Sequence, residues 1–209
     1  MNIKEINEEI ARLQALRKEL VDYEPTVCGI GYLGDDYDKT TDKAVYARWN
    51  GILQRCYNPN YTNYNSYGAN GVVVADEWLN FSNFKKWFLD SYYDIGDEKL
   101  VTDKDILVKN NKVYSSETCL LVPVSFNSIF AGMNEYNTKG IKYGVSGLKQ
   151  QSNGRYQLQL FGTTFSNFNT VEEAKETRKN VYKALLQGLV NNYPTMPTYV
   201  KDSILNAEI

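Results

Sequence analysis

Four residues near the middle of the chain could do chemistry: Asp103, Lys104 and Asp105 are adjacent, and Asn127 follows further on. Carboxylate and amide oxygens are ligands that Mg²⁺ accepts. A histidine, whose pKa of about 6.5 leaves it able to accept a proton at neutral pH, is absent from the chain. A lysine, with a pKa of about 10.4, stays protonated and can pair with a phosphate. The cluster therefore predicts phosphate contact by Lys104, and the alternative is a solvated loop lysine beside two acids.

The sequence around this cluster predicts the elements that would hold it. The runs Ile106–Lys109 and Cys119–Val122 favour β-strands, and the Asn110-Asn111 pair between them tolerates a positive φ and suits a turn. Pro123 precedes a helical segment that carries Asn127. The apolar side of that helix is expected to comprise Phe126, Ile129 and Phe130.

An aromatic-rich segment upstream could give this small unit a core. Residues Ala44–Asn58 predict a helix with Trp49 on its apolar stripe, and Val72–Val74 predict a buried strand. Arg48 and Arg55 lie one heptad apart on a neighbouring face of the helix. For each arginine the alternatives are phosphate contact and a salt-bridged helix face. We favour phosphate contact for Arg55 and the salt-bridged face for Arg48.

The order strand, turn, strand and helix resembles the ββα-metal core of HNH nucleases, in the degenerate form common in bacteriophage homing-endonuclease-like proteins. The acid and catalytic histidine of that family fall on Asp103-Lys104. The preceding segment adds to the resemblance through the motifs Tyr46-x-x-Trp49, Arg55-Cys56-Tyr57-Asn58-Pro59, Tyr67-Gly68-x-x-Gly71-Val72 and Glu77-Trp78. The resemblance implies a vestigial centre of Asp103, Lys104, Asp105 and Asn127, in which Asp103 and Asn127 could still hold Mg²⁺.

A second module is predicted towards the C-terminus. Asn153-Gly154 is a strong hairpin signal, and beyond it apolar and polar residues alternate as in a half-buried strand. A further short strand is expected at Thr163–Phe165. The capping box that starts at Thr170 opens a helix to about Val190, which should cover the apolar face of the sheet. Its apolar stripe is expected to comprise Val171, Ala174, Val181, Tyr182, Leu185 and Leu189.

Three strands packed by one helix resemble the AP2 DNA-binding domain that is often fused to phage HNH proteins. The motifs that carry this are Gly144-Val145, Gly154-Arg155-Tyr156 and Phe168-Asn-Thr-Val-Glu-Glu-Ala174. In that family the exposed sheet face enters the major groove, which implies that Ser146, Lys149, Arg155, Gln157 and Gln159 face DNA. Arginine can bind guanine and glutamine can bind adenine, each through two hydrogen bonds to the base edge. The alternative is a polar sheet that faces solvent and has no partner.

The N-terminal residues 2–22 predict an amphipathic helix. Asn2 and Glu5 form a capping box, and Ile3, Ile6 and Ile10 begin a series of apolar a and d positions. Such a helix could pair as a coiled coil and make the protein a homodimer, or it could pack on its own body.

Composition narrows the function classes. The net charge of −2 means that any DNA-binding face must be a local patch. The chain has three cysteines that are far apart, Cys28, Cys56 and Cys119, and this odd number argues against a disulfide framework. Because the chain also lacks histidine, a zinc site is not expected. No apolar run suits a signal peptide or a membrane span. We therefore expect a reduced, cytoplasmic protein with no membrane partner, and the resemblance to phage proteins implies the cytoplasm of a host bacterial cell.

Together these features predict an α+β protein: an N-terminal helix that could form a coiled coil, a ββα-type HNH-like domain and an AP2-like sheet packed by one helix. The expected boundaries are an N-terminal helix at 1–24, a linker at 25–43, the HNH-like domain at 44–130, a linker at 131–139, the AP2-like domain at 140–192 and a tail at 193–209.

The predicted function is binding of double-stranded DNA by a phage protein derived from an HNH homing endonuclease and lacking efficient cleavage. One alternative is an active, metal-dependent nicking endonuclease, because a metal lowers the pKa of bound water on its own. Another alternative is a phage inhibitor of a host defence system, similar to anti-CRISPR proteins, that binds a host protein. The acidic stretch at residues 35–38 and the 17 tyrosines are compatible with such an interface.

Overall fold

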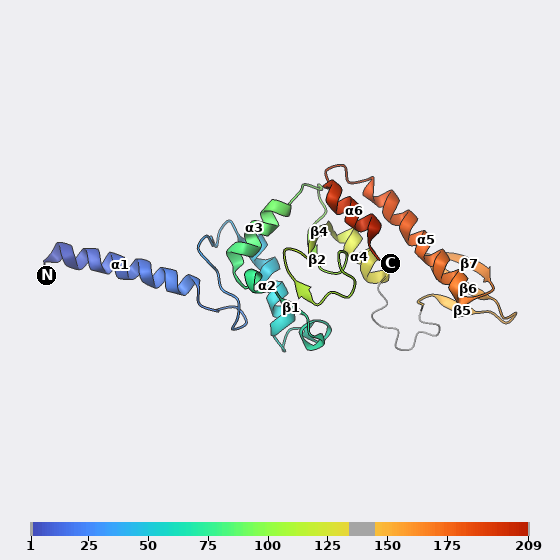
Figure 1. The fold of residues 1–209 in the computed structure, drawn as a ribbon, viewed down its shortest axis with the longest axis horizontal. Helices are drawn as coiled ribbons and strands as arrows, with labels where there is room; N and C mark the ends of the chain where they lie inside the picture. Colours follow the sequence, from blue (N-terminus) through green and yellow to red (C-terminus); the bar gives the residue numbers. More distant parts are fainter. Residues whose placement is uncertain (1, 134–144, 209) are drawn as a thin grey trace. The chain divides into compact units, whose positions relative to one another are not determined.

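Helices and small sheets alternate along this α+β chain (Figure 1). The structure, a computed structural model, describes residues 2–133 and 145–208, without the side chains of 17–22 and 132–133. It divides into two compact units, Met1–Tyr92 with Asn110–Leu120, and Tyr93–Lys109 with Leu121–Ile209. The expected HNH-like segment 44–130 therefore contributes residues to both units.

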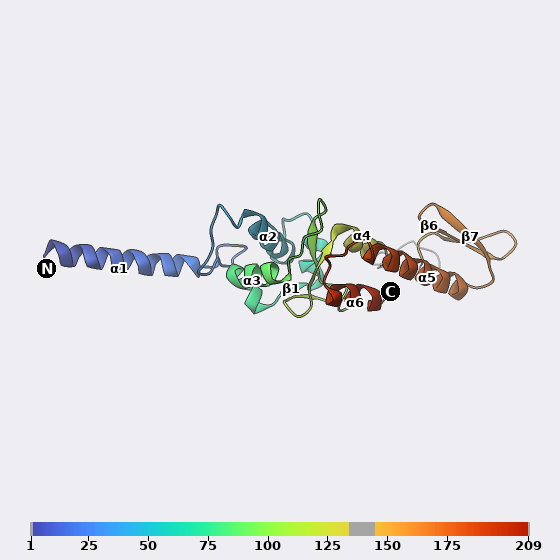
Figure 2. The same cartoon turned by 90° about the horizontal axis from the view of Figure 1, so that it is seen from above.

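The first helix, α1, spans Ile3–Asp22 and forms where the sequence predicts it. Its first turn is closed by the expected capping box. Glu5 N donates to Asn2 Oδ1 at 2.9 Å, and Asn2 N donates to Glu5 Oε2 at 2.8 Å. Figure 2 shows α1 as one uninterrupted helix.

The core of the first unit lies between α2 (Lys43–Tyr57) and α3 (Phe81–Ser91), with a 3₁₀ turn at Asp76–Leu79 leading into α3. The sequence predicts an apolar stripe of Val45, Trp49, Ile52, Leu53 and Cys56 on α2. The last four are buried, as predicted, and Val45 is half-buried. Trp49 Nε1 donates to Trp78 O at 2.7 Å, which satisfies the one polar atom of a fully buried indole.

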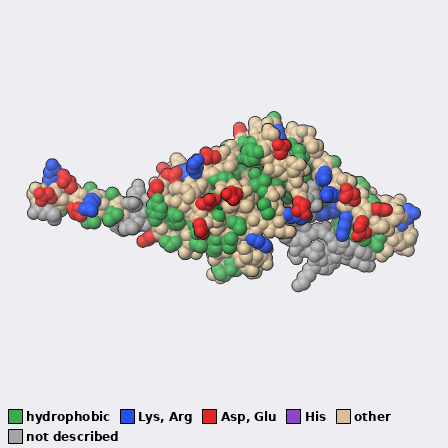
Figure 3. Space-filling model, viewed as in Figure 1, with side chains coloured by type: hydrophobic (Ala, Val, Ile, Leu, Met, Phe, Trp, Pro, Cys, Tyr) green, Lys and Arg blue, Asp and Glu red, His purple; other side chains and the backbone are tan. Residues whose placement is uncertain are grey.

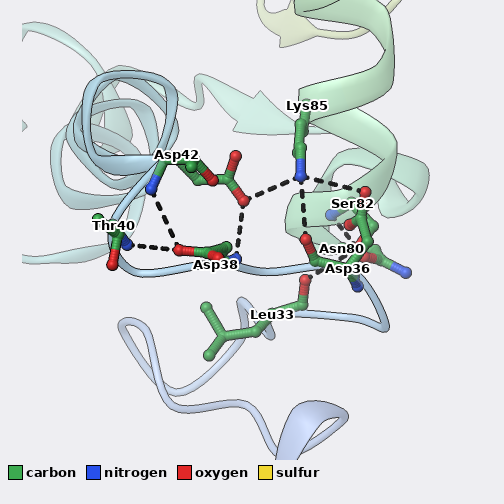
Figure 4. A network of polar contacts seen from close by, with 9 residues as sticks. Leu33, Asp36, Asp38, Thr40, Asp42, Asn80, Ser82 and Lys85 are labelled. Atoms are coloured by element: carbon green, nitrogen blue, oxygen red, sulfur yellow. Dashed lines mark hydrogen bonds and ion pairs between the residues drawn. The ribbon is translucent and has the colours of Figure 1, made fainter.

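The acidic stretch before α2 lies in the segment predicted as a linker at 25–43. Its aspartates are hydrogen-bonded to the first unit, so this stretch is not a free linker. Lys85 Nζ on α3 donates to Asp42 Oδ2 at 2.9 Å and to Asp36 O at 2.9 Å. Asp38 Oδ1 accepts from Thr40 N at 2.7 Å. Figure 4 shows these aspartates gathered around the α2 N-terminus and Lys85. The carboxylates therefore accept hydrogen bonds from nearby backbone N–H groups and from Lys85.

Two short strands complete the first unit. β1 (Val73–Val74) pairs in parallel with β3 (Val113–Tyr114). Short 3₁₀ turns at Tyr64–Ser66 and Gly68–Asn70 connect α2 to β1. The second turn ends at Gly71, whose φ of 78° is left-handed and suits glycine.

In the second unit, β2 (Leu100–Asp103) pairs with β4 (Leu120–Pro123), and α4 (Val124–Met133) packs against β2. The predicted strand at Ile106–Lys109 is wrong, because this segment is a series of bends after β2. The second strand and the helix after it lie where they were expected. The predicted turn at Asn110 is also confirmed, by a φ of 60°.

A glutamate ties the start of α4 to the C-terminal segment. Glu98 Oε1 accepts from Ser125 N at 2.7 Å, and Glu98 Oε2 accepts from Tyr193 Oη at 2.5 Å. Burial would raise the pKa of Glu98, but these hydrogen bonds outweigh it and the pKa lies below its ordinary value.

The C-terminal sheet contains β5 (Leu148–Gln150), β6 (Tyr156–Leu160) and β7 (Thr163–Phe168), all antiparallel. Helix α5 (Val171–Val190) packs on β6 and β7, and α6 (Thr198–Asn206) packs on α5 (Figures 1 and 2). The three strands, the hairpin turn and the covering helix are therefore confirmed at this level.

The buried face of α5 and the end of α4 differ from what the sequence predicts. The buried residues of α5 are Ala174, Tyr182, Leu186 and Val190. Of the predicted stripe only Ala174 and Tyr182 are among them, and the other four, Val171, Val181, Leu185 and Leu189, are half-buried. Of the expected linker at 131–139, residues 131–133 belong to α4, and 134–139 lie outside the described residues.

Candidate nucleic-acid interface

The end of β2 carries Asp103, which is buried and hydrogen-bonded to the chain that follows it. Its Oδ1 accepts from Asp105 N and from Ile106 N, each at 2.8 Å. A carboxylate that binds nearby backbone N–H groups in this way closes a tight turn. Burial raises the pKa of Asp103 above its ordinary value of 3.8, although both N–H donors act to lower it.

Lys104 is 7% exposed, so the alternative of a solvated loop lysine is wrong. Its Nζ lies 2.7 Å from Asp105 Oδ1 and 2.8 Å from Oδ2, and Asp105 is half-buried. The ammonium is therefore already close to a negative charge within the chain. Phosphate contact by Lys104 stays a prediction, and the neighbouring carboxylate would weaken it.

The metal ligands implied by the resemblance are a poor match to Mg²⁺ chemistry. Asp103 uses one oxygen for two backbone donors, and its raised pKa disfavours the ionised form that a cation needs. Asn127 is half-buried on α4. Among residues 2–133 and 145–208, no three His, Cys, Asp or Glu residues gather as a metal site. Coordination of Mg²⁺ by Asp103 and Asn127 stays a prediction.

Arg55 lies among aromatic rings in the first unit. Its guanidinium carbon is 5.3 Å from the centroid of the Tyr67 ring and 5.5 Å from that of Tyr114, and its Nε donates to Gly51 O at 3.1 Å. Arg48 lies 5.3 Å from the ring centroid of Phe88. These cation–π contacts give both arginines a packing role, and phosphate contact by Arg55 stays a prediction.

The C-terminal sheet brings three of the predicted DNA-facing residues together. Lys149 on β5 lies directly opposite Gln157 on β6, and Gln159 follows two positions later on the same strand. Residues two apart on a strand share one face. Leu158, between the glutamines, is fully buried, so the three polar side chains occupy the face that α5 does not cover.

The position of Gln157 on this face is fixed by a neighbour. Gln151 Nε2 donates to Gln157 Oε1 at 2.9 Å, across the mouth of the β5–β6 hairpin. The bond leaves the amide nitrogen of Gln157 directed away from Gln151. A glutamine held in one orientation presents a defined donor to a ligand, with less loss of side-chain entropy on binding.

The other two predicted residues lie just outside the strands of the sheet. Arg155 is exposed immediately before β6, and its N donates to Asn153 Oδ1 at 3.0 Å within the turn. Ser146 is exposed two residues before β5. They lie at opposite ends of β5, the strand that carries Lys149.

Sequence reasoning missed Thr164, which is exposed and lies opposite Gln159 in the β6–β7 ladder. The register comes from a two-residue turn at Phe161-Gly162, where φ is 48° and 77°. A phenylalanine rarely adopts a left-handed φ, so the usual hairpin signal was absent. Phe161 rests edge-on against Tyr182 of α5, with ring centroids 5.3 Å apart.

The charge of the C-terminal module differs from that of the chain. Residues 140–192 contain seven Lys and Arg against three Glu, a net charge of +4, whereas the whole chain carries −2. Figure 3 shows Lys and Arg side chains gathered over α5 and its sheet, with acidic side chains among them. Four of these basic residues, Lys175, Arg178, Lys179 and Lys183, lie on α5, while Lys149 and Arg155 lie on or beside the sheet. The positive charge therefore belongs to the module as a whole, and phosphate binding requires such a local excess in an acidic chain.

Comparisons with protein-family models, with curated proteins and with solved structures found no match to this chain. Within the described residues, no helix is both long and apolar enough to cross a membrane.

Proposed function

We propose that this protein binds double-stranded DNA through the uncovered face of its C-terminal sheet. The observation that carries the proposal is the row of Lys149, Gln157 and Gln159 on one face of an antiparallel sheet whose other face is buried under α5. Lys149 and the exposed Arg155, which immediately precedes β6, supply positive charge on or beside this face. The proposal assigns the module to an AP2-like arrangement, in which the sheet enters the major groove.

The spacing of the glutamines fits base recognition. Residues two apart on a strand are separated by roughly 6.8 Å, and stacked base pairs repeat every 3.4 Å or so along the duplex. Gln157 and Gln159 could thus reach bases two steps apart. A glutamine amide pairs with the N6 and N7 edge of adenine, while Lys149 on the next strand supplies charge to a phosphate or to a guanine edge.

The proposal also holds that the body derives from an HNH homing endonuclease of bacteriophage type and no longer cuts efficiently. The pairing of β2 with β4, followed by α4, supports the ββα comparison. The absence of histidine and the contact of Lys104 with Asp105 support loss of the proton acceptor. A protonated amine that is hydrogen-bonded to a carboxylate cannot act as a general base.

Fluorescence anisotropy on a labelled random-sequence duplex, over a series of salt concentrations, tests the proposal. Log affinity should fall linearly with log salt, with a slope that corresponds to roughly 4–8 phosphates. The triple variant Lys149→Ala, Gln157→Ala, Gln159→Ala should bind at least about tenfold more weakly. Its matched control is Lys183→Ala with Gln187→Ala, which removes the same residue types from the exposed side of α5.

Two outcomes would contradict the proposal. One is equal loss of binding in the sheet variant and in the α5 control, and the other is no binding of the wild type at low salt.

A cleavage assay tests the loss of nuclease activity. Supercoiled plasmid incubated with the protein and Mg²⁺ or Mn²⁺ should stay intact. Nicking that disappears in Asp103→Ala would instead identify an active endonuclease.

A further inference from the structure

Helix α1 carries an apolar stripe that nothing in the described chain covers. The exposed fractions along it are 79% for Ile3, 38% for Ile6, 47% for Ile10, 54% for Leu13 and 47% for Leu16. The first four occupy successive a and d positions of a heptad, and Leu16 widens the stripe at a g position. Figure 3 shows apolar side chains at the surface of this helix between charged ones.

Charged side chains beside and opposite the stripe already pair with one another. Lys4 Nζ lies 3.9 Å from Glu8 Oε1, and Arg12 Nη1 lies 3.4 Å from Glu9 Oε2. Such i,i+3 and i,i+4 pairs stabilise an exposed helix only slightly. An amphipathic helix of this length gains most of its stability by burying its apolar side. Burial of the stripe therefore requires a partner with an apolar surface of similar length.

We propose that α1 pairs with α1 of a second copy of this chain as an antiparallel two-helix coiled coil. Five side chains that each lose on the order of 100 Å² of apolar surface, counted on both helices, bury about 1,000 Å² in total. This area is near the lower limit for a specific interface. It predicts a reversible dimer with a dissociation constant in the range of about 1–100 μM.

The distribution of charge sets the orientation. Residues 2–11 contain one lysine and three glutamates, a net charge of −2, whereas residues 12–22 contain three basic and two acidic residues, a net charge of +1. A parallel pair would place like charges together along its whole length. An antiparallel pair places the acidic half of each helix beside the basic half of the other, and it also opposes the two helix dipoles.

The first experiment measures mass in solution across concentration, by sedimentation equilibrium on nuclease-treated full-length protein. The wild type should shift from monomer to dimer between about 1 and 200 μM. The variant Ile6→Glu, Leu13→Glu should remain monomeric throughout. The matched control Ala11→Glu, Ala15→Glu adds the same two charges at exposed positions off the stripe and should dimerise more than tenfold better than the stripe variant.

Circular dichroism on each variant checks that the rest of the protein stays folded. A wild type that is monomeric at every concentration overturns the proposal, and this is the result expected if α1 packs on its own body. Dimerisation that survives in the Ile6→Glu, Leu13→Glu variant overturns it equally, because the contact would then lie elsewhere.

A second experiment tests the orientation by distances between spin labels in the dimer. Cys28→Ser removes the partly exposed native thiol, while Cys56 and Cys119 are buried. Labels are placed singly by Lys4→Cys or Ala11→Cys, which share the b position of the heptad. With a rise of about 1.5 Å per residue, antiparallel helices should give a distance roughly 10 Å or more longer at residue 4 than at residue 11. Equal distances would show a parallel pair and overturn the antiparallel assignment.

Discussion

The ammonium of Lys104 lies within hydrogen-bonding distance of both carboxylate oxygens of Asp105, at 2.7 and 2.8 Å. The two residues are neighbours in sequence, and the lysine is buried at the end of β2. A cation in this setting is hydrogen-bonded and charge-paired within its own chain. The acidic cluster that first suggested a catalytic centre thus has a structural role: Asp103 closes the turn and Asp105 neutralises Lys104.

Removal of Lys104 should leave the half-buried carboxylate of Asp105 without the lysine that pairs with it. We expect Lys104→Ala to lower the free energy of unfolding by about 2–3 kcal/mol, somewhat less than for a fully buried pair. The control is Lys109→Ala, whose Nζ lies 3.6 Å from Glu208 with side chains 33% and 78% exposed. That change should cost less than about 0.5 kcal/mol. Urea unfolding measures both, and equal losses would show that the Lys104–Asp105 pair is no more than a surface contact.

The raised pKa of Asp103 predicts a specific pH dependence. When the folded pKa lies above the ordinary value of 3.8, the folded state binds the proton more tightly, so its contribution to stability is present at low pH and is lost as pH rises through the folded pKa. Asp103→Asn keeps an oxygen that can accept from Asp105 N and Ile106 N, and it has no charge to desolvate. The stability of this variant minus that of the wild type should therefore increase from pH 3.5 or so to about pH 7.

Urea unfolding at several pH values measures that difference. The variant Asp103→Ala serves as the control, because it loses both hydrogen bonds and should be less stable than Asp103→Asn by about 1–3 kcal/mol at every pH. A stability difference between Asp103→Asn and wild type that shrinks as pH rises would contradict the assignment of burial as the dominant cause.

Adjacent lysines on α3 offer a comparison of buried and exposed ion pairs. Lys85 Nζ lies 2.9 Å from Asp42, with side chains 16% and 7% exposed, while Lys86 Nζ lies 2.6 Å from Asp90, with side chains 77% and 64% exposed. Lys85→Ala should cost about 2–4 kcal/mol because it leaves a buried carboxylate unpaired. Lys86→Ala should cost less than about 0.5 kcal/mol despite its shorter distance. Thermal and urea unfolding give both values, and a larger effect at Lys86 would refute this ranking.

Local signals in the sequence predicted the elements that depend only on local contacts. The capping residues of α1 form the expected hydrogen bonds. At α5, Glu173 N donates to Thr170 Oγ1 at 3.1 Å, and Glu173 Oε2 accepts from Asn169 N at 2.7 Å. Each of these bonds joins residues within four positions of one another, so the residue types alone are enough to indicate them.

The misplaced strand shows where local signals stop. Ile106, Leu107 and Val108 have the composition of a strand, but only Ile106 is buried. Asp103 Oδ1 takes the N–H groups of residues 105 and 106, which turns the chain out of the sheet. The outcome depends on whether one carboxylate folds back on the backbone, and apolar periodicity does not report that. The buried stripe of α5 also differs from the predicted one, because the elements packed on the helix, the sheet and α6, decide that Leu186 is buried and Leu185 is not.

The candidate interface was predictable as a face but not as a complete set of residues. Alternation along β6 indicated that Gln157 and Gln159 share a side. Thr164 required the register of β7, which depends on a turn that places a phenylalanine at positive φ. Strand pairing beyond one hairpin is set by such turns and by packing on the helix.

Lys149 and the two glutamines on the sheet are predicted to affect different properties of DNA binding: the lysine its salt dependence, and the glutamines its sequence preference. Lys149→Ala should lower affinity for all duplexes alike and reduce the salt slope by about one phosphate, since it removes charge. Gln157→Ala and Gln159→Ala should leave the slope unchanged. Each should instead reduce the preference for adenine at one base position by about 1–3 kcal/mol, because an amide reads the base edge.

Selection of bound sequences from a random duplex pool, followed by salt titration of the preferred site, measures both effects. Since the two glutamines lie two residues apart on β6, their affected base positions should differ and should be separated by about two steps. The control Gln187→Ala on α5 should change neither the preferred sequence nor the slope. If Lys149→Ala altered the preferred sequence while the glutamine variants altered only the slope, the roles assigned to the strands would be reversed, and the sheet would bind DNA in another orientation.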